Sequence, residues 1–307
     1  FTIPQFFSRR FRDDKNILAV LAAVIIIIFF IPYTASGFAA CGKLFSSLFG
    51  MNYMTAMIIS AVVIVAYTTA GGFFAASATD FVQSIIMTVA IVFVLVFSTI
   101  SAGGVDAVVE NAKALPGYLS LTASYIEDTG KSEPYNLLHI ITTLSWGLGY
   151  FGMPHILLRF MAIEDEKKLK LSRRVASVWV VIAMAMAVLI GVVGRALSNT
   201  GLVDQLHGND TETIIVRVAH LLSTYGAFPA IMAGLILAGI LASTMSTADS
   251  QLLAAASSVS ENILREAFHL KISEKKSMLA ARLTVIGIAI LGIIIARNPD
   301  SSVFGIV

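Results

Sequence analysis

The chain has 307 residues, of which 57% are hydrophobic and only 13% are charged, and its mean hydropathy is +0.85. A soluble domain is typically about 45–50% apolar and about 25% charged. The composition therefore excludes an ordinary soluble enzyme and a disordered chain, and it favours a lipid environment. The net charge of +2 is too small to indicate a nucleic-acid partner. The single cysteine, Cys41, has no second cysteine with which to form an internal disulfide.

Seven apolar stretches are long enough to cross a bilayer, whose core of about 30 Å takes about 20 helical residues. Because they are continuous rather than alternating, they predict helices and not barrel strands. We therefore expect an all-α integral membrane protein with about seven transmembrane helices. The sequence lacks an initial Met and stops as another apolar run begins, so we expect a fragment cut at both ends. The predicted spans are roughly residues 17–41, 53–74, 79–101, 137–160, 174–197, 227–256 and 279–297.

The basic residues are distributed unevenly between the two sides of these predicted spans. When residues near span ends are counted with the adjoining connection, 15 of the 21 lysines and arginines lie on the side of the N-terminus. Lysine and arginine accumulate in cytoplasmic loops. We therefore expect a multi-pass protein of the plasma membrane with a cytoplasmic N-terminus and an external, acidic segment at 102–136. The loops are too short for a soluble domain, so the function must lie among the helices or at their ends.

The sixth predicted span carries polar residues that are costly in lipid. Ser243, Ser246, Thr247 and Ser250 fall on one helical face, and Asp249 lies among them. Hydroxyl and carbonyl oxygens suit a hard, partly dehydrated cation such as sodium. The alternative is that small hydroxyl residues pack at a helix–helix interface and bond to carbonyls of their own helix. Packing explains the hydroxyls but not the carboxylate, and the residues alone leave both interpretations open.

The fourth predicted span is interrupted by three glycines and by Pro154, which disfavours a continuous helix. Broken helices near the middle of a membrane expose backbone groups to a ligand. Trp146 and Tyr150 are four residues apart and share a helical face, so they suit the wall of a site for a small organic solute. Close packing of glycines, with the aromatic residues as interface anchors, is the alternative.

Two other polar positions lie near the ends or kinks of predicted spans. In the first span Pro32 predicts a kink in the helix, and Tyr33, which follows it, predicts a polar surface at this kink. Asp80 follows Thr79 at the predicted start of the third span, where the pair is suited to cap the helix. A role for Asp80 in an ion path is the less favoured interpretation from these residues alone.

Four segments resemble the sodium/proline symporter branch of the sodium/solute symporter family. The most specific of them reads GLGYFGMPHILLRFM at 147–161. The others read GGFFAASATDFVQ at 71–83, MSTADSQLL at 245–253 and YTASG at 33–37. The resemblance covers essentially the whole chain, in order and with matching gaps.

The resemblance implies an inverted-repeat, LeuT-like transporter fold. Members of the family have about thirteen spans, of which ten form two five-helix repeats. By the resemblance, residues 1–307 are a single transmembrane transporter domain that starts at about the third core helix and ends at the start of the tenth. The first two core helices, one of which supplies carbonyl ligands to sodium, are then outside the chain.

The resemblance also assigns roles to individual residues. Ser246 and Thr247 match the hydroxyl ligands of the family's sodium site, and Ser243 matches the position that gives a backbone carbonyl. The positions that match the family's substrate site are Trp146, Tyr150, Pro154 and Tyr33.

A second sodium site is a further hypothesis from the resemblance. Asp80 matches an aspartate on the sodium exit path, and Asp249 stands where the family pattern has a small polar residue. Some family members hold a second sodium between these two helices. Asp80, Asp249, Ser250 and Ser246 are therefore candidates for an inner cation site. The alternative is that Asp249 lines a water-filled vestibule.

The sequence thus predicts a sodium-coupled secondary transporter, not an enzyme, that imports an amino acid, with L-proline as the leading substrate. The expected ligands are Na⁺ and a small solute, and the lipid bilayer is the expected environment. Three alternatives stay open. They are a symporter for another small organic solute such as pantothenate, a transporter-like membrane sensor with a C-terminal signalling domain, and a structural membrane protein.

Overall fold

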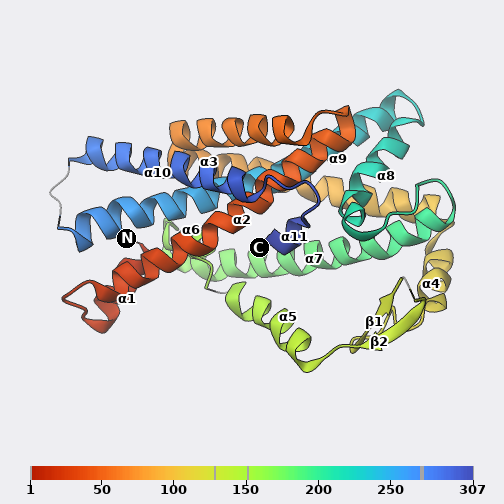
Figure 1. Ribbon diagram of the computed structural model, residues 1–307, viewed down its shortest axis with the longest axis horizontal. Coiled ribbons are helices and arrows are strands. Elements are labelled where there is room, and N and C mark those ends of the chain that lie inside the picture. The colour runs from red at the N-terminus through yellow and green to blue at the C-terminus, as the bar shows by residue number, and fades with distance from the viewer. Residues whose placement is uncertain (1, 128, 151, 270–272, 307) are drawn as a thin grey trace. The chain divides into compact units, whose positions relative to one another are not determined.

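A computed structural model describes residues 2–127, 129–150, 152–269 and 273–306, in which helices predominate (Figure 1). The described part also contains one small antiparallel hairpin. The elements are α1 (Ile3–Phe11), α2 (Ile17–Phe49), α3 (Tyr53–Ser101), α4 (Val105–Ala114), β1 (Ala123–Ile126), β2 (Lys131–Pro134), α5 (Leu137–Tyr150), α6 (Pro154–Met161), η1 (Glu166–Lys168), α7 (Leu169–Asn199), η2 (Gly208–Thr213), α8 (Ile214–Ser223), α9 (Ala227–Ser257), the π-helical η3 (Ser258–Ala267), α10 (Glu274–Ile295) and α11 (Val303–Ile306).

Among the described residues, five helical segments are long and apolar enough to cross a membrane. They are α2, α3, α7 with η1, α9 with η3, and α10. The 49 residues of α3 give a combined helical length of about 74 Å at about 1.5 Å per residue, which is enough for the second and third predicted spans together. The fourth predicted span is divided between α5 and α6, as its glycines and proline predicted.

Helix α3 is interrupted at Gly72, whose φ of 60° and ψ of −159° are not helical. Only glycine adopts this backbone region without strain. The expectation of a loop at 75–78 with a cap at Thr79 and Asp80 is therefore wrong. The second half of α3 is already helical there, and the Thr79 hydroxyl bonds to the carbonyls of Ala75 and Ala76 inside it. Asp80 is thus an interior helix residue, which leaves its carboxylate available for contacts with other helices.

The described chain forms two compact units, each built from separate segments. The first unit comprises residues 1–87, 154–163 and 238–307, and the second comprises residues 88–153 and 164–237.

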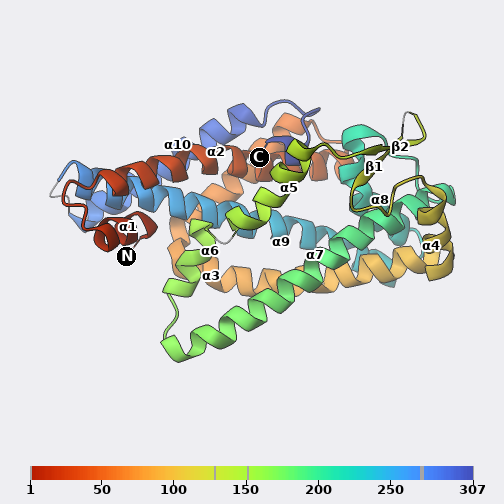
Figure 2. The same cartoon turned by 90° about the horizontal axis from the view of Figure 1, so that it is seen from below.

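In the first unit, α2 packs against α1, η3 and α10 (Figure 2). Small residues allow this close approach. A Cβ atom on Gly42 would lie 2.7 Å from the Tyr53 ring, and one on Gly292 would lie 3.2 Å from the Phe38 ring. The Tyr53 hydroxyl also donates to the carbonyl of Ala296, at 2.7 Å. These contacts fix α2, the start of α3 and the end of α10 in one body.

A polar network joins η3, which follows α9, to α1 in the same unit. Asn262 of η3 is fully buried, and its side-chain amide donates to Thr2 Oγ1 at 2.9 Å and to Glu266 Oε2 at 3.1 Å. Gln5 of α1 donates to the other oxygen of Glu266, at 2.8 Å. Because buried polar groups need partners, this set of bonds holds α1 against η3.

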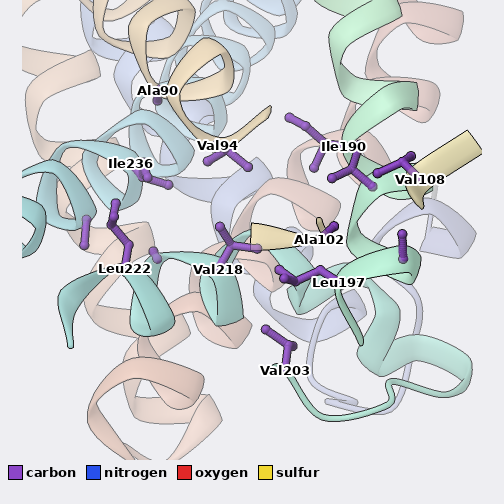
Figure 3. Packing of buried hydrophobic residues seen from close by; sticks show 14 residues of the cluster. Ala90, Val94, Ala102, Val108, Ile190, Leu197, Val203, Val218, Leu222 and Ile236 are labelled. Carbon is purple, nitrogen blue, oxygen red and sulfur yellow. The ribbon is translucent and has the colours of Figure 1, made fainter. Parts of the chain in front are cut away.

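The core of the second unit is formed by side chains from α3, α4, α7, α8 and α9 (Figure 3). Leu197, Val218 and Ile236 are each at most 1% exposed. The β1–β2 hairpin belongs to this unit, and Glu127 just after β1 pairs with Arg195 of α7. Along the rest of α7 the large apolar side chains are mostly exposed, as expected for a surface that faces lipid.

Candidate ion and substrate sites

The three residues that the sequence predicted as sodium ligands lie together on α9. The Ser246 hydroxyl donates to the carbonyl of Ser243 at 3.1 Å, and the Thr247 hydroxyl donates to the same carbonyl at 3.0 Å. One backbone oxygen and two hydroxyl oxygens thus converge within one helical turn. The same bonds are those that the packing alternative predicted. The assignment of these residues to sodium therefore stays a prediction.

One turn further along α9, Ser250 takes part in a network that reaches two other helices. Arg159 of α6 donates from Nη2 to Ser250 Oγ and also to Asp80 Oδ2 on α3. Asp80 and Ser250 are each only 7% exposed. The predicted grouping of Asp80 with Ser250 is present in the structure, and the sequence analysis missed the arginine between them.

Asp249 is fully buried next to this network. Its Oδ2 atom accepts a hydrogen bond from the Tyr67 hydroxyl of α3 at 2.9 Å, and its Oδ1 atom lies 3.0 Å from the Ser250 hydroxyl. The Tyr67 hydroxyl is also 3.1 Å from the carbonyl of Met245. Asp249 therefore has no solvent-exposed surface in the described part of the chain. Its side chain instead links α9 to the first half of α3.

An open cavity of about 390 Å³ lies beside Tyr67 in the first unit. It flanks the Gly72 break in α3, and its lining is mainly apolar. Thr79, the neighbour of Asp80 in the sequence, and Gln83, about one turn further along α3, also line it. The lining residues are Tyr67, Ala70, Gly71, Ala75, Thr79, Gln83 and Met245.

Of the predicted substrate residues, Tyr33 and Pro154 belong to the first unit. Pro154 begins α6, and His155 beside it packs edge-on against Tyr33, with ring centroids 6.3 Å apart. Phe30 contacts the same histidine ring at 5.5 Å. Tyr33 is thus held next to the first turn of α6 by an aromatic contact.

Trp146 and Tyr150 belong to the second unit and lie one turn apart at the C-terminal end of α5. They are 40% and 45% exposed, and no residue of α5 is buried. Gly152 closes the turn after α5 through a bond of 3.0 Å to the carbonyl of Gly149. The broken helix that the sequence predicted is therefore confirmed, and the two aromatic side chains project from its last turn.

A charged cluster in the second unit is centred on Glu127, which lies outside the membrane-spanning segments. Glu127 accepts a hydrogen bond from Arg195 at 3.2 Å, and its other oxygen lies 3.4 Å from His207 Nδ1. The hydrogen bond from Arg195 holds the pKa of Glu127 below its usual value of 4.5. The Arg195 guanidinium also lies 5.3 Å from the ring centroid of Tyr125. The cluster joins the hairpin to the end of α7.

Two functional candidates were missed by the sequence analysis, for different reasons. Arg159 was counted with the basic residues of a loop, although it stands inside the motif at 147–161 that carries the resemblance. Tyr67 gave no signal, because a tyrosine in an apolar span is common at membrane interfaces. Asp249 gave an indirect signal for Tyr67. A carboxylate within a membrane span needs a hydrogen-bond donor, and another helix had to supply that donor.

The long apolar helices and the polar network inside them define a helical membrane protein. The sequence model of the sodium:solute symporter family matches residues 1–307, and the chain belongs to this family.

The chain is similar to named proline transporters along its whole length. It is 38% identical over 306 residues to the osmoregulated proline transporter OpuE of Bacillus subtilis, covering 100% of this chain and 59% of the relative. It is 36% identical over 309 residues to sodium/proline symporter 2 of Staphylococcus saprophyticus and to the sodium/proline symporter of Staphylococcus aureus, covering 100% of this chain and 57% of each relative. The chain thus spans less than two thirds of the length of these relatives.

A solved structure supports the fold. The substrate-bound, outward-open state of a Na⁺-coupled sialic acid symporter matches with a TM-score of 0.76 and 18% identity. The match covers 96% of this chain and 61% of that one. The predicted transporter fold is therefore confirmed. The family model confirms the predicted family.

Proposed function

We propose that the protein containing this chain is a sodium-coupled secondary transporter that imports an amino acid, with L-proline as its substrate. The observation that carries the proposal is the similarity of the whole chain, at 36–38% identity, to relatives named as proline transporters. The oxygen cluster on α9 is in accord with it, because a transporter driven by sodium needs oxygen ligands within its helices.

The sodium ion would bind at Ser243, Ser246 and Thr247. These residues supply one carbonyl and two hydroxyl oxygens within one turn. The two hydroxyl groups now donate to the Ser243 carbonyl, and they are able to rotate so that their lone pairs face a cation. A complete shell for sodium needs more oxygens, which the remaining length of the protein would supply.

Proline would bind against the aromatic side chains of Trp146 and Tyr150 in the second unit. The resemblance also assigns Tyr33 and Pro154 of the first unit to substrate binding. An apolar ring fits an aromatic surface, and a break between two helices, such as the one between α5 and α6, is a place where backbone groups bind polar parts of a ligand. No covalent step is involved, so the protein is a carrier and not an enzyme.

Coupling follows from the alternating-access equilibrium. Sodium and proline would each shift this equilibrium by their differential affinity for one conformation. Each ligand then raises the affinity of the other by the same factor. We further propose that the protein lies in the plasma membrane with residue 1 on the cytoplasmic side, which the distribution of lysine and arginine supports.

The test is uptake of radiolabelled proline into liposomes that contain the purified full-length protein. An inward sodium gradient should drive accumulation, and a sodium ionophore or replacement of sodium by potassium should abolish it. Pantothenate and sialic acid are tested in parallel as alternative solutes. Uptake of proline that is independent of the sodium gradient would refute sodium coupling. Accumulation of another solute in place of proline would refute the substrate assignment.

A matched pair of variants tests the sodium site itself. Thr247→Ala removes a hydroxyl from the proposed site, whereas Thr284→Ala removes a hydroxyl on α10 that also bonds within its own helix, at 2.9 Å. Only the first variant should require more sodium for half-maximal uptake. If both variants reach half-maximal uptake at the same sodium concentration, the α9 hydroxyls serve in helix packing and do not bind sodium.

A further inference from the structure

Helix α1 buries one face and exposes aromatic side chains on the other. Pro4 and Ser8, which lie one turn apart, are buried. Phe7 and Phe11 also lie one turn apart, but both are exposed, and Phe11 is 65% exposed. Phe6 is exposed as well, and its ring packs edge-on against the ring of Phe7, with centroids 5.8 Å apart. Because three phenylalanines on one outer face are unfavourable in water, this face needs an apolar environment.

Exposed basic residues surround these aromatic side chains. Arg10 lies on α1 itself, and Arg12 and Lys15 follow it in the connection to α2. The start of α10 lies at the same end of the first unit, where α1 and α10 both contact η3 (Figures 1 and 2). It adds the exposed Lys275 and Lys276. Aromatic and basic side chains on one surface are typical of a helix that lies in a membrane interface.

The acidic residues near this surface offset its positive charge only in part. Asp13 Oδ2 accepts a hydrogen bond of 2.6 Å from the backbone amide of Leu18, so this carboxylate serves to cap α2. Glu266 accepts hydrogen bonds from two side-chain amides in the network between α1 and η3. Asp14 is exposed. Residues 2–16 hold four basic and two acidic side chains, so the segment stays positive.

The connection to α2 places this surface where the chain enters the membrane. Residues 12–16 separate α1 from α2, which is long and apolar enough to span a membrane and whose first residue, Ile17, is 60% exposed. The connection is held on both sides. The Ser8 hydroxyl donates to the carbonyl of Asp13 at 3.2 Å, and the Asn16 amide donates to the carbonyl of Glu266 in η3 at 3.3 Å. Helix α1 is therefore fixed beside the end of α2 at which that span begins.

We propose that this surface, formed by the outer face of α1 and the start of α10, binds anionic phospholipids, with the phenylalanine rings among the acyl chains and the basic side chains at the headgroups. The rings supply apolar contact area and the basic residues supply attraction to negative charge, and both strengthen interfacial binding. Each lysine or arginine near the surface should favour an anionic lipid by roughly fivefold. The inference goes beyond the proposed function and does not depend on it.

The experiment places a fluorescent reporter on this surface by the substitution Phe11→Trp in the purified full-length protein. The protein is reconstituted into phosphatidylcholine vesicles, and brominated lipids quench the tryptophans that they contact. The fluorescence of the parent is subtracted to isolate the added tryptophan. Brominated phosphatidylglycerol should quench it at a mole fraction at least about fivefold lower than brominated phosphatidylcholine does. High salt should reduce this preference, because it screens charges at the surface.

Charge variants are made in the Phe11→Trp background. Arg10→Gln with Lys15→Gln removes two positive charges and should lower the anionic preference at least about fivefold. Arg10→Lys with Lys15→Arg keeps both charges and should retain the preference. As a matched control, Lys113→Gln with Arg217→Gln removes two exposed charges from the second unit and should leave the preference unchanged.

Three results would overturn the inference. Absence of quenching by either lipid would show that the remaining length of the protein covers α1. Equal quenching by the two lipids would show that the surface meets lipid without selecting anionic headgroups. An anionic preference that persists in folded Arg10→Gln, Lys15→Gln protein would assign it to other residues. If that variant does not fold, a preference in Phe11→Trp protein that is independent of salt overturns the inference. Proline uptake is a separate measurement, so these results leave the proposed function unchanged.

Discussion

Replacement of Tyr67 by Phe tests the bond that holds the buried Asp249. The change removes one hydroxyl group and keeps the ring that lines the cavity. The lost hydrogen bond of 2.9 Å has a carboxylate acceptor in a fully buried residue. Hydrogen bonds to charged groups contribute about 1.5–3 kcal/mol, and we expect the free energy of unfolding to fall by about that amount. Unfolding by SDS in mixed micelles measures it.

Tyr53→Phe is a matched control in the same unit. Its hydroxyl donates to the neutral carbonyl of Ala296 at 2.7 Å, so its loss should cost about 0.5–1.5 kcal/mol. In an Asp249→Asn background the cost of Tyr67→Phe should shrink, with a coupling energy of about 1 kcal/mol or more. A Tyr67→Phe cost no larger than that of Tyr53→Phe, combined with strict additivity in the Asp249→Asn background, would refute the assignment of this bond.

Three further outcomes are expected. Trp146→Ala and Tyr150→Ala should raise the KM for proline about tenfold to a hundredfold, because each removes roughly 1–3 kcal/mol of apolar contact; unchanged KM values would remove both residues from the substrate site. Ser246→Ala should lower the apparent affinity for sodium, and saturating sodium should restore much of the proline affinity; a normal sodium curve would contradict this. The Glu127–Arg195 pair should stabilise the protein above about pH 4.5 and lose this effect as the pH falls through the lowered pKa of Glu127. Glu127→Gln should therefore make the thermal stability depend less on pH between pH 3 and pH 6. If the parent and the variant show the same pH dependence, the pair contributes nothing to stability.

The helices of this fold were predictable from the sequence because lipid offers no hydrogen-bond partners to the backbone. Each long apolar run had to be helical, since every backbone group must find its partner inside the segment. The break after Tyr150 was predictable for a related reason, because Pro154 cannot continue a helix through its own amide. The break at Gly72 was located less well. The predicted second span ended at residue 74, close to this break, but local rules for caps placed the next helix start at Thr79 and Asp80.

The error at Asp80 shows where such local rules fail. An aspartate after a threonine is a good cap in isolation. In the structure the break lies at Gly72, so Asp80 is inside α3, and Arg159 of another helix supplies its counter-charge. The two residues of this ion pair are far apart in the chain, and a single sequence does not show which helices pack against each other. The same limit applies to Tyr67 and Asp249, which are 182 residues apart.

Arg159 also bears on the predicted orientation, because it was counted among the basic residues on the cytoplasmic side. The structure pairs its charge with Asp80, so it does not act as an exposed loop charge. Without it, 14 basic residues lie on the side of residue 1 and six on the other, and the asymmetry persists. The proposed orientation therefore does not depend on this arginine. With residue 1 in the cytoplasm, α6 ends at the inner side, and the Asp80–Arg159–Ser250 network lies in the cytoplasmic half of the membrane.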